Sequence, residues 1–359
     1  MSNVRIGVVG LGYWGPNLVR CLARNPACDV TYVCDRDASR LKNIASQFSA
    51  IRPTDEIDDV LSGDDVDAVV IATPTKTHFA MAKSALSHGK HVFVEKPLST
   101  NSDECRELIE LADLKGLTLF VGHVFLHSSP VNKLRELIRT GALGDIYYIS
   151  SKRLNLGPVR RDVNALWDLA PHDVSVMIDL LGTSPLAVSC CGSSYLNAGI
   201  QDVCNLTLHF PGDRLGIVHV SWLDPRKDRE MTVVGSEKMV VYDDLEPLEK
   251  IKVYDRGVEA PPTNSFGEFQ YSYRYGDMYS PRLEQFEPLA AECNDFIRAI
   301  TDGGVPLTDG INGLRVVEVL EAAGESLRLG GSCVRVPHWS RTDSHLVRKR
   351  ARPASIAAG

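Results

Sequence analysis

The sequence has no long hydrophobic run, no excess of positive charge and no paired cysteine motif. None of its apolar stretches approaches the roughly 20 residues that a membrane-spanning helix needs. Its first residues, MSNVRIGVVGLGYWG, place glycines and a tryptophan where a signal peptide has a plain apolar segment, so we expect a cytoplasmic protein with no membrane partner. With 39 Lys and Arg against 46 Asp and Glu, the net charge of -7 provides no basic footprint for nucleic acid.

Cysteine usage argues against a disulfide framework and against a zinc motif. The nine cysteines are an odd number and none belongs to a C-x-x-C pair. Several lie in apolar strand-like runs, such as Cys34 in VTYVCD. Reduced, buried thiols are the interpretation that this pattern favours, and we predict no metal site.

The length of 359 residues is enough for two domains. Short β-branched runs alternate with amphipathic helical patterns in the first part of the chain, and the runs lie at 4–9, 30–35, 68–73, 92–95 and 119–121. Near-continuous apolar strands between helices are typical of a parallel sheet covered on both faces. We predict that residues 1–122 form an α/β domain of the Rossmann type, with a doubly wound parallel sheet.

The pattern changes after residue 122. One helical segment at 130–139 is followed by seven strand-like runs between residues 146 and 254, some joined by hairpin-type turns such as FPGDRL. Two helical patterns follow, at 283–301 and 310–329. We predict that residues 123–337 form an α+β domain with a large, mostly antiparallel open sheet, and that residues 338–359 form a flexible basic tail.

A glycine motif directly follows the first predicted strand. In VVGLGYWG, Gly10 permits a tight turn, Gly12 lets the backbone approach a pyrophosphate, and Gly15 lets the next helix pack closely. The free N–H groups at the start of that helix favour the anion. A strand before the motif and a helix after it predict a dinucleotide site, in which we include Tyr13 and Trp14.

The end of the second predicted strand indicates which dinucleotide binds. Asp35 follows Gly15 by about twenty residues, where a carboxylate accepts hydrogen bonds from the adenosine ribose hydroxyls. This position favours NAD as the cofactor. Arg36 leaves NADP open as the alternative, because its guanidinium is able to pair with a 2′-phosphate.

Two further strand ends should face the nicotinamide, because the carboxyl ends of parallel strands open into the ligand crevice. The third and fourth runs end in ATPTKTH and VEKP. The cofactor-binding residues that we predict there are Thr73, Pro74, Thr75, His78, Glu95, Lys96 and Pro97. A lysine at the end of a buried strand needs a partner for its ammonium group, so a salt-bridged structural lysine is the alternative for Lys96.

Three motifs in this order resemble one known family. The glycine motif, the E-K-P motif around Lys96, and Asp168 with His172 in a D-x-x-x-H pair resemble the glucose-fructose oxidoreductase / inositol dehydrogenase (Gfo/Idh/MocA) family, over nearly the whole chain up to about Pro337. The resemblance implies an NAD(P)-dependent enzyme acting on CH–OH groups, and a homodimer or homotetramer. It implies that Lys96 and His172 handle the substrate proton and oxygen, and that Asp168 supports them.

The residues around His172 give this role a separate argument. The segment from Trp167 to Gly182, WDLAPHDVSVMIDLLG, is typical of a helix with Pro171 near its first position. His172 would then lie at a helix N-terminus, where the dipole disfavours imidazolium and leaves a neutral ring ready to accept a hydroxyl proton, while Lys96 donates a hydrogen bond to the oxygen. A histidine that only caps or packs there is the alternative.

The segment SKRLNLGPVRRDVNALW should border the substrate pocket, since it leads from a strand into the D-x-x-x-H helix. Its cationic and amide side chains suit a phosphate or carboxylate, with a solvated basic loop as the alternative. The substrate-binding residues that we predict are Lys96, His123, Arg153, Asn155, Arg160, Asn164, Asp168 and His172.

The substrate class follows from the resemblance alone. The chain is most similar to the branch of the family that oxidises nucleotide-activated amino sugars and uronates at C3, the UDP-N-acetylglucosaminuronate 3-dehydrogenases. Sugar 3-ketoreductases of deoxysugar pathways and inositol or free-sugar dehydrogenases are the alternatives. From another class, a non-catalytic dinucleotide sensor is an alternative, but the presence of both Lys96 and His172 favours an enzyme.

Overall fold

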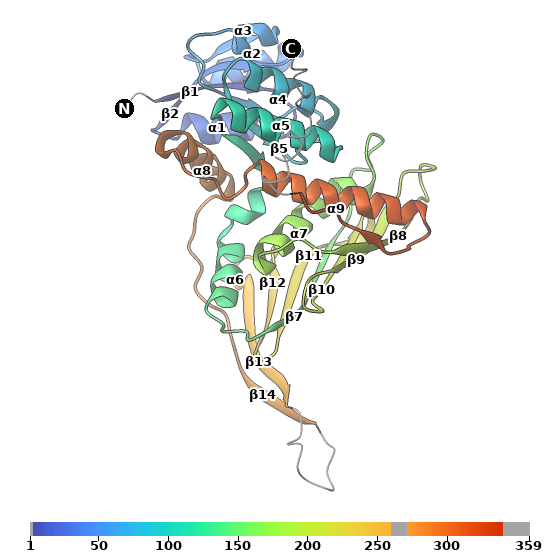
Figure 1. Ribbon diagram of the computed structural model, residues 1–359. Coiled ribbons are helices and arrows are strands. Elements are labelled where there is room, and N and C mark those ends of the chain that lie inside the picture. Colours follow the sequence, from blue (N-terminus) through green and yellow to red (C-terminus); the bar gives the residue numbers. More distant parts are fainter. Residues whose placement is uncertain (1–2, 260–270, 340–359) are drawn as a thin grey trace, which may run out of the picture.

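The computed structural model describes residues 3–259 and 271–339, and Figure 1 shows its two sheets one above the other. The first sheet has six parallel strands in the order β3-β2-β1-β4-β5-β6. Their bounds are β1 Val4–Val9, β2 Cys28–Cys34, β3 Arg52–Thr54, β4 Ala68–Ile71, β5 His91–Glu95 and β6 Leu119–Gly122. The strand order reverses between β1 and β4, which is where such sheets open a ligand crevice.

Helices cover both faces of this sheet, as predicted for a doubly wound domain. They are α1 Gly15–Ala23, α2 Ala38–Gln47, α3 Ile57–Leu61, α4 His78–Ser87 and α5 Ser102–Lys115, with a 3-10 turn, η1, at Thr75–Thr77. Asn101 shows why α5 begins where it does, because its side chain accepts hydrogen bonds from two N–H groups of the first turn. The strand β3 was missed, since it has three residues, one of them a proline, at the sheet edge.

The second sheet has nine strands in the order β14-β13-β12-β11-β7-β10-β9-β8-β15. Among the described strands of this second sheet, only β7 and β10 are parallel neighbours, so the prediction of a large, mostly antiparallel sheet is confirmed. The bounds are β7 Ile146–Leu156, β8 Ala187–Ser193, β9 Val203–His209, β10 Leu215–Ser221, β11 Leu223–Gly235, β12 Met239–Asp243, β13 Ile251–Glu259, β14 Ser272–Tyr279 and β15 Val334–Arg335.

One strand of this sheet was missed. Nearly all side chains of β14 are exposed, so no buried face gives it an alternating pattern. Strand β10 alternates in part: Val218 and Val220 are buried while Ile217 is 40% exposed, but Ser221 is buried as well. The predicted tail, 338–359, lies outside the described residues except for its first two positions.

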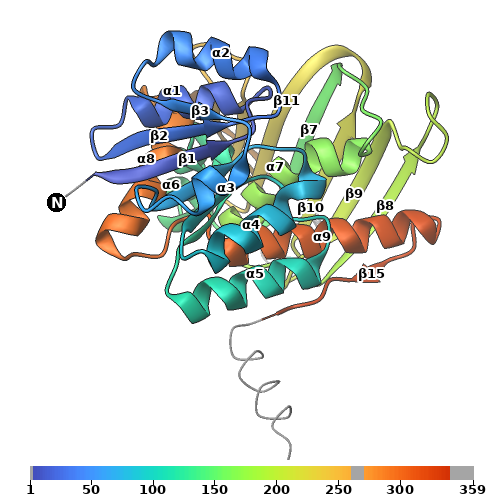
Figure 2. The same cartoon turned by 90° about the horizontal axis from the view of Figure 1, so that it is seen from above.

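The remaining helices lie between and beside the sheets. They are a 3-10 turn, η2, at Val124–His127, then α6 Ser129–Arg139, α7 Ala165–Leu181, α8 Pro288–Asp302 and α9 Gly310–Arg328. Although it follows the second sheet in the chain, α8 packs on the first, where Phe296 contacts the rings of Phe93 and Phe120. Figure 2 shows α5 beside both α4 and α9. Helices from the end of the chain therefore pack on the first domain as well as on the second.

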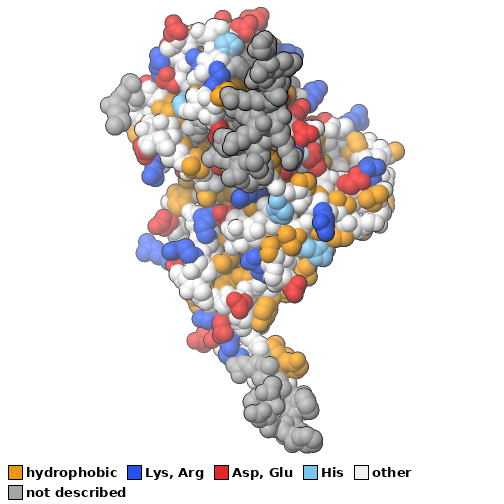
Figure 3. Space-filling model, viewed as in Figure 1, with side chains coloured by type: hydrophobic (Ala, Val, Ile, Leu, Met, Phe, Trp, Pro, Cys, Tyr) orange, Lys and Arg blue, Asp and Glu red, His pale blue; other side chains and the backbone are white. Residues whose placement is uncertain are grey.

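Charged side chains of both signs are mixed on the described surface. Figure 3 shows acidic and basic side chains interspersed over the visible face. Within the described ranges, no helix combines the length and the apolar character needed to cross a membrane. All nine cysteines are free thiols, and all but Cys191 and Cys333 are buried.

Candidate active site

A cleft of about 1020 Å³ opens at the carboxyl ends of β1, β2, β4 and β5, where the strand order reverses. The predicted site residues that line it are Gly10, Gly12, Tyr13, Trp14, Asp35, Arg36, Thr73, Pro74, Thr75, His78, Glu95, Lys96, Arg160 and Asp168. Of the others, Gly15 starts α1 and Pro97 lines a small adjoining cavity. The second sheet contributes through the loop and helix that carry Arg160 and Asp168.

The glycine motif has the geometry that a dinucleotide requires. Gly10 has a φ of 93°, and a Cβ there would lie 2.8 Å from the backbone of Ala72. A Cβ on Gly15 would lie 2.1 Å from the carbonyl oxygen of Gly10. At Gly12 nothing lies within 4 Å of the Cβ position, so the backbone there is open to a ligand. The cleft and its glycines therefore fit a pyrophosphate-bearing cofactor.

The start of α1 is suited to an anion. No side chain caps it, and its first turn contains no acidic residue that would occupy the positive end of the helix. Pro16 near the start removes one N–H, but the other free donors and the dipole remain. Tyr13 and Trp14, whose rings meet edge to face, stand exposed at the mouth of the cleft.

Asp35 is held against the glycine loop. Its carboxylate oxygens accept hydrogen bonds from the N–H of Leu11 at 2.6 Å and from the N–H of Asp37 at 2.8 Å. Arg40 approaches the same carboxylate at 3.5 Å and, with the exposed Arg36, lines the cleft. Sequence reasoning missed Arg40, although its place in the first turn of α2, just beyond Asp35, was a usable signal.

His78 joins the two loops that border the nicotinamide end of the cleft. Its ring nitrogens lie 2.8 Å from the carbonyl oxygens of Thr73 and Pro97, and the side chain is buried. Burial lowers the pKa of His78, and the two carbonyl oxygens oppose this shift because they favour a ring that donates through both nitrogens. His78 therefore connects the loop after β4 to the loop after β5.

Lys96 connects the loop after β5 to helix α7. Its Nζ donates a hydrogen bond to the backbone carbonyl of Asp168 at 2.9 Å. Burial lowers the pKa of Lys96, although the negative charges of Asp168 and Glu95 partly oppose this. Burial likewise raises the pKa of Glu95 to about 7. A lysine whose charged form is disfavoured is able to accept a proton.

The Asp168 carboxylate is fixed by two side chains rather than by Lys96 or His172. It accepts hydrogen bonds from the indole N–H of Trp222 at 3.0 Å and from Arg160 at 3.3 Å. Sequence reasoning missed Trp222 as a site residue. The signal was the indole N–H of a tryptophan directly after β10, which needs an acceptor when it is buried.

The expected position of His172 at a helix N-terminus is wrong. Helix α7 begins at Ala165, with Asn164 as its N-cap, and Pro171 lies inside it. His172 is therefore about two turns into the helix, beyond the reach of the terminal dipole. The sequence argument took Pro171 for a start signal, whereas Asn164 accepts a hydrogen bond from the N–H of Trp167 and starts the helix earlier.

Burial and neighbouring cations keep His172 neutral instead. They hold its pKa well below the usual value, with burial as the main cause and the charges of Lys96 and Arg153 adding to it. The edge of its ring meets Phe125, with the ring centroids 4.9 Å apart. Its Nδ1 is buried without a hydrogen-bond partner among the described residues.

His123 is buried next to the same lysine. Neither of its ring nitrogens has a hydrogen-bond partner in the described part of the chain. Burial, and secondarily the charge of Lys96, lowers the pKa of His123 to about 3. Like His172, this ring is neutral in the folded protein.

The other predicted substrate residues have structural partners of their own. Arg153 forms a buried ion pair with Asp173, at 2.8 Å and 3.2 Å, and lies 4.6 Å above the ring of Phe125. Asn164 caps α7 and donates to Gln201 at 2.7 Å. Asn155 is half-buried near the end of β7. Their roles toward substrate stay predictions.

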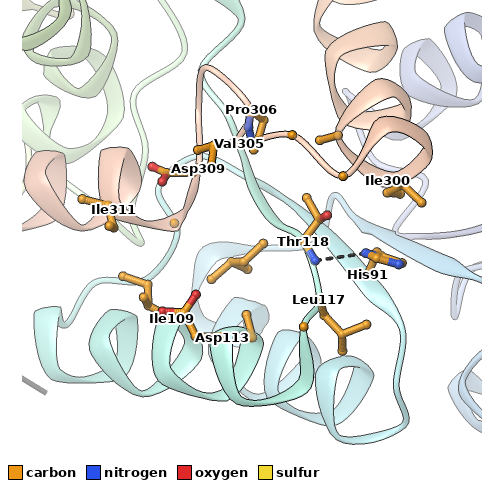
Figure 4. Close-up of a pocket in the computed structure, with 17 residues that line it drawn as sticks. His91, Ile109, Asp113, Leu117, Thr118, Ile300, Val305, Pro306, Asp309 and Ile311 are labelled. Atoms are coloured by element: carbon orange, nitrogen blue, oxygen red, sulfur yellow. Dashed lines mark hydrogen bonds between the residues drawn. The ribbon is translucent and has the colours of Figure 1, made fainter. Parts of the chain in front are cut away.

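A second cavity, of about 250 Å³, lies at the opposite end of the first sheet (Figure 4). His91 and Thr118 border it at the amino ends of β5 and β6, where Nδ1 of His91 accepts a hydrogen bond from the N–H of Thr118 at 3.0 Å. It contains none of the predicted site residues. Within the described residues, no group of three or more His, Cys, Asp or Glu side chains could hold a metal ion.

Comparison with known families decides the class of the protein. A family model described as "Oxidoreductase family, NAD-binding Rossmann fold" (Gfo/Idh/MocA) matches residues 4–123, and the model of the GFO/IDH/MocA C-terminal domain matches residues 131–241. The chain belongs to this family. The predictions of the fold, of an NAD-dependent oxidoreductase and of NAD as the cofactor are thereby confirmed.

Two individual relatives match most of the chain, and a third matches less than half of it. The UDP-N-acetylglucosamine 3-dehydrogenase of Acidithiobacillus ferrooxidans is 27% identical over 88% of this chain and 95% of its own, and its structure, 25% identical, has a TM-score of 0.76 over 92% and 100%. The structure of GenD2 from gentamicin A biosynthesis, in complex with NAD, is 26% identical with a TM-score of 0.78 over 94% and 97%. An uncharacterized oxidoreductase of Streptococcus pneumoniae is 34% identical, but the match spans 42% of this chain and 40% of that protein.

Proposed function

We propose that this oxidoreductase interconverts a secondary alcohol and a ketone on a nucleotide-activated amino sugar or uronate, at C3. The observation that carries the proposal is the meeting of Lys96, from the E-K-P loop, with the helix that bears Asp168 and His172, at the nicotinamide end of the cleft. The similarity to a UDP-N-acetylglucosamine 3-dehydrogenase over most of both chains supports the substrate class.

The glycine loop, the start of α1 and Asp35 have a geometry that fits NAD. The glycine loop and the uncapped start of α1 would receive the pyrophosphate, and Asp35 the adenosine ribose. When bound, NAD supplies the acceptor for the hydride that leaves the alcohol carbon. The protein itself must orient the alcohol and remove its proton.

We infer that Lys96 rather than His172 accepts the proton. The charges of Lys96 and Arg153 near His172 oppose a positive charge on its ring, whereas burial favours the neutral amine of Lys96. The neutral amine accepts the hydroxyl proton, and the neutral imidazole donates a hydrogen bond to the oxygen as it becomes negative. This reverses the two roles expected from the sequence, and the physical reason is the interior position of His172 in α7.

The test is an NAD reduction assay with a defined set of alcohols. We expect turnover with UDP-N-acetylglucosamine or UDP-N-acetylglucosaminuronate and none with free glucose or myo-inositol, and thermal-shift stabilisation by the same sugars in the presence of NAD. Turnover of myo-inositol alone would overturn the substrate class, and the inositol 2-dehydrogenase of Rhizobium meliloti, 25% identical over 90% of this chain, makes that arm informative.

The oligomeric state is part of the same proposal. Apolar side chains on two neighbouring strands of the second sheet are exposed on one face, among them Tyr148 on β7 and Leu215 and Ile217 on β10. Exposed apolar surface of this kind fits a contact between copies in a homodimer or homotetramer. Light scattering of the purified protein decides it, and a monomer at micromolar concentration would contradict the assembly.

A further inference from the structure

Three acidic side chains, Glu95, Glu292 and Asp295, form a group that begins next to Lys96 in the chain and ends on α8. Its central member is Glu292 on α8, which is fully buried. Both of its carboxyl oxygens lack a hydrogen-bond partner among the described residues. Burial raises the pKa of Glu292 well above its usual value, and the nearby carboxyl groups of Glu95 and Asp295 act in the same direction. Glu292 is therefore a neutral carboxylic acid in the folded protein.

The inner end of this group reaches the active site. Glu95, the last residue of β5, directly precedes Lys96 and lines the cofactor cleft. Gly122 on the neighbouring strand makes room for its carboxyl group, because a Cβ there would lie 3.1 Å from Oε2 of Glu95. Glu95 thus lines the cofactor cleft and also acts electrostatically on Glu292.

The outer end reaches a different cavity. Asp295 lies three residues after Glu292, so the two side chains share one face of α8. Asp295 lines a cavity of about 210 Å³ together with His127, and accepts a hydrogen bond from the N–H of Leu307 at 3.0 Å. Nε2 of His127 lies 3.4 Å from the hydroxyl of Thr308. This cavity is separate from the cofactor cleft and shares no lining residue with it.

Glu292 lies on the part of α8 that packs in an apolar core, next to Cys293 in the chain and about one turn from Leu289 and Phe296. Phe93, Phe120 and Phe296 pack with ring centroids 4.9 to 5.6 Å apart, and all three are buried. A carboxyl group without hydrogen bonds in such surroundings lowers stability, so an apolar residue would serve the core better. The cost makes a functional reason for Glu292 worth testing.

We propose that Glu292 relays the substrate proton from the active site to Asp295 and the outer cavity. The inference rests on the proposed role of Lys96 as proton acceptor. The ammonium of Lys96 passes its proton to the Glu95 carboxylate, and the acid so formed passes it to the carbonyl oxygen of Glu292. Glu292 releases its own hydroxyl proton toward the Asp295 carboxylate. One proton enters and one leaves, no electrons move, and Glu292 is neutral before and after.

Occupation of the cleft explains why such a route is useful. A cofactor and a sugar bound in the cleft would cover Lys96, so a proton released there would have no direct access to solvent. Among the described residues no hydrogen bond or ion pair joins Lys96 to Glu95, and Glu292 has no partner, so the proposed relay requires water molecules between these groups. The ionisable groups that face Glu292 are Glu95 from β5 and Asp295 and Cys293 from α8, and burial keeps the Cys293 thiol neutral.

Glu292→Gln is the decisive variant, because glutamine has the same size and neutrality but cannot pass on a proton. With the sugar identified in the substrate assay, we expect kcat to fall about tenfold or more, with KM and the Kd for NAD within about twofold of wild type. We expect a larger solvent deuterium isotope effect on kcat and partial rescue by imidazole buffer. In the infrared spectrum, a protonated carboxyl band that shifts in D2O should be lost.

Glu318→Gln is the matched control. Glu318 on α9 is also buried and has a raised pKa, but it pairs with Arg106 at 2.7 Å and does not face Glu95. Its replacement should leave kcat and the isotope effect unchanged. Asp295→Asn, at the half-buried outer end, should reproduce the slow, buffer-rescued turnover even if Glu292→Gln folds poorly.

The outcomes separate the two proposals. Wild-type kcat, isotope effect and pH profile in Glu292→Gln, or normal turnover in Asp295→Asn, would overturn the relay while leaving the oxidoreductase proposal intact. Failure of the wild type to reduce NAD with any sugar would overturn the proposed function. In that case the infrared band still reports whether Glu292 is protonated, and its absence from the wild type would overturn the relay independently.

Discussion

The candidate active site has a dinucleotide half and a proposed proton-transfer half, and they use different parts of the chain. The dinucleotide half is made of backbone: Gly10 and Gly15 have no space for a Cβ, and no side chain caps the start of α1. The proton-transfer half is made of side chains that burial forces toward their neutral forms, Lys96, His172 and His123. A local motif specifies the first half, whereas the second depends on what the rest of the molecule places around it.

The acidic side chains of the two halves show the same contrast. Asp35 accepts hydrogen bonds from two backbone N–H groups next to it in the fold. Asp168 is fixed by Trp222, which directly follows β10, and by Arg160, from the loop between β7 and α7. Substitutions in the dinucleotide half should therefore affect binding and local backbone, while those in the other half should affect chemistry.

The largest effect is expected at the proton-transfer centre. Lys96→Met should lower turnover by about 10² or more, and His172→Asn by a smaller factor, because in the proposed mechanism the lysine accepts the proton and the histidine donates a hydrogen bond. The Kd for NAD should change little. Steady-state kinetics with the sugar substrate, and calorimetry with NAD, measure both quantities.

A double variant sharpens this expectation. Lys96→Met with His172→Asn should cost much less than the sum of the two single losses in activation free energy, because residues that act as one unit are not additive. Near-normal turnover in His172→Asn with a raised KM would show that the histidine only binds. A larger loss in His172→Asn than in Lys96→Met would restore the roles expected from the sequence.

The next effect concerns the backbone half. Gly10→Ala should destabilise the fold by about 2–3 kcal/mol, because φ is positive there and the new methyl group meets the backbone of Ala72. Gly12→Ala is the matched variant, since its Cβ position is open. It should keep the stability of the wild type but weaken NAD binding. Denaturant unfolding and calorimetry separate the two, and equal stability of both variants would contradict the geometric argument.

Asp35→Ala should weaken NAD binding by roughly 1 to 3 kcal/mol, because ribose hydroxyls and the N–H of Leu11 lose a charged acceptor. Calorimetry with NAD and NADP measures the change. The removal of the carboxylate should also narrow the preference for NAD, since Arg36 and Arg40 remain at the cleft. Tighter binding of NADP than of NAD by the wild type would refute the assignment and make these arginines the specificity residues.

The smallest effect tests a residue that the sequence assigned to substrate. Asn164→Ala should lower the free energy of unfolding by about 1 kcal/mol, because α7 loses its N-cap. If capping is its whole role, KM for the sugar stays unchanged. Asn164→Asp, which keeps the cap, is the control for stability, and a raised KM in both variants would show that the amide also contacts the substrate.

The sequence by itself determined the local features of this protein. Period-two and helical patterns indicated most strands and helices, and the spacing from Gly10 to Asp35 predicted the cofactor site, because these signals arise within one strand, turn and helix. The weaknesses were also local: the short edge strand β3 and the exposed strand β14 have no buried face to reveal them.

The tertiary structure alone decided the chemistry of the proton-transfer half. The pKa values of Lys96 and His172 depend on burial and on charges from distant segments, so no local pattern contains them. Trp222 reaches Asp168, and Glu292 reaches the neighbourhood of Glu95, only after α7, α8 and the two sheets have packed together. Electrostatic effects act through space, and only the fold sets which groups are neighbours.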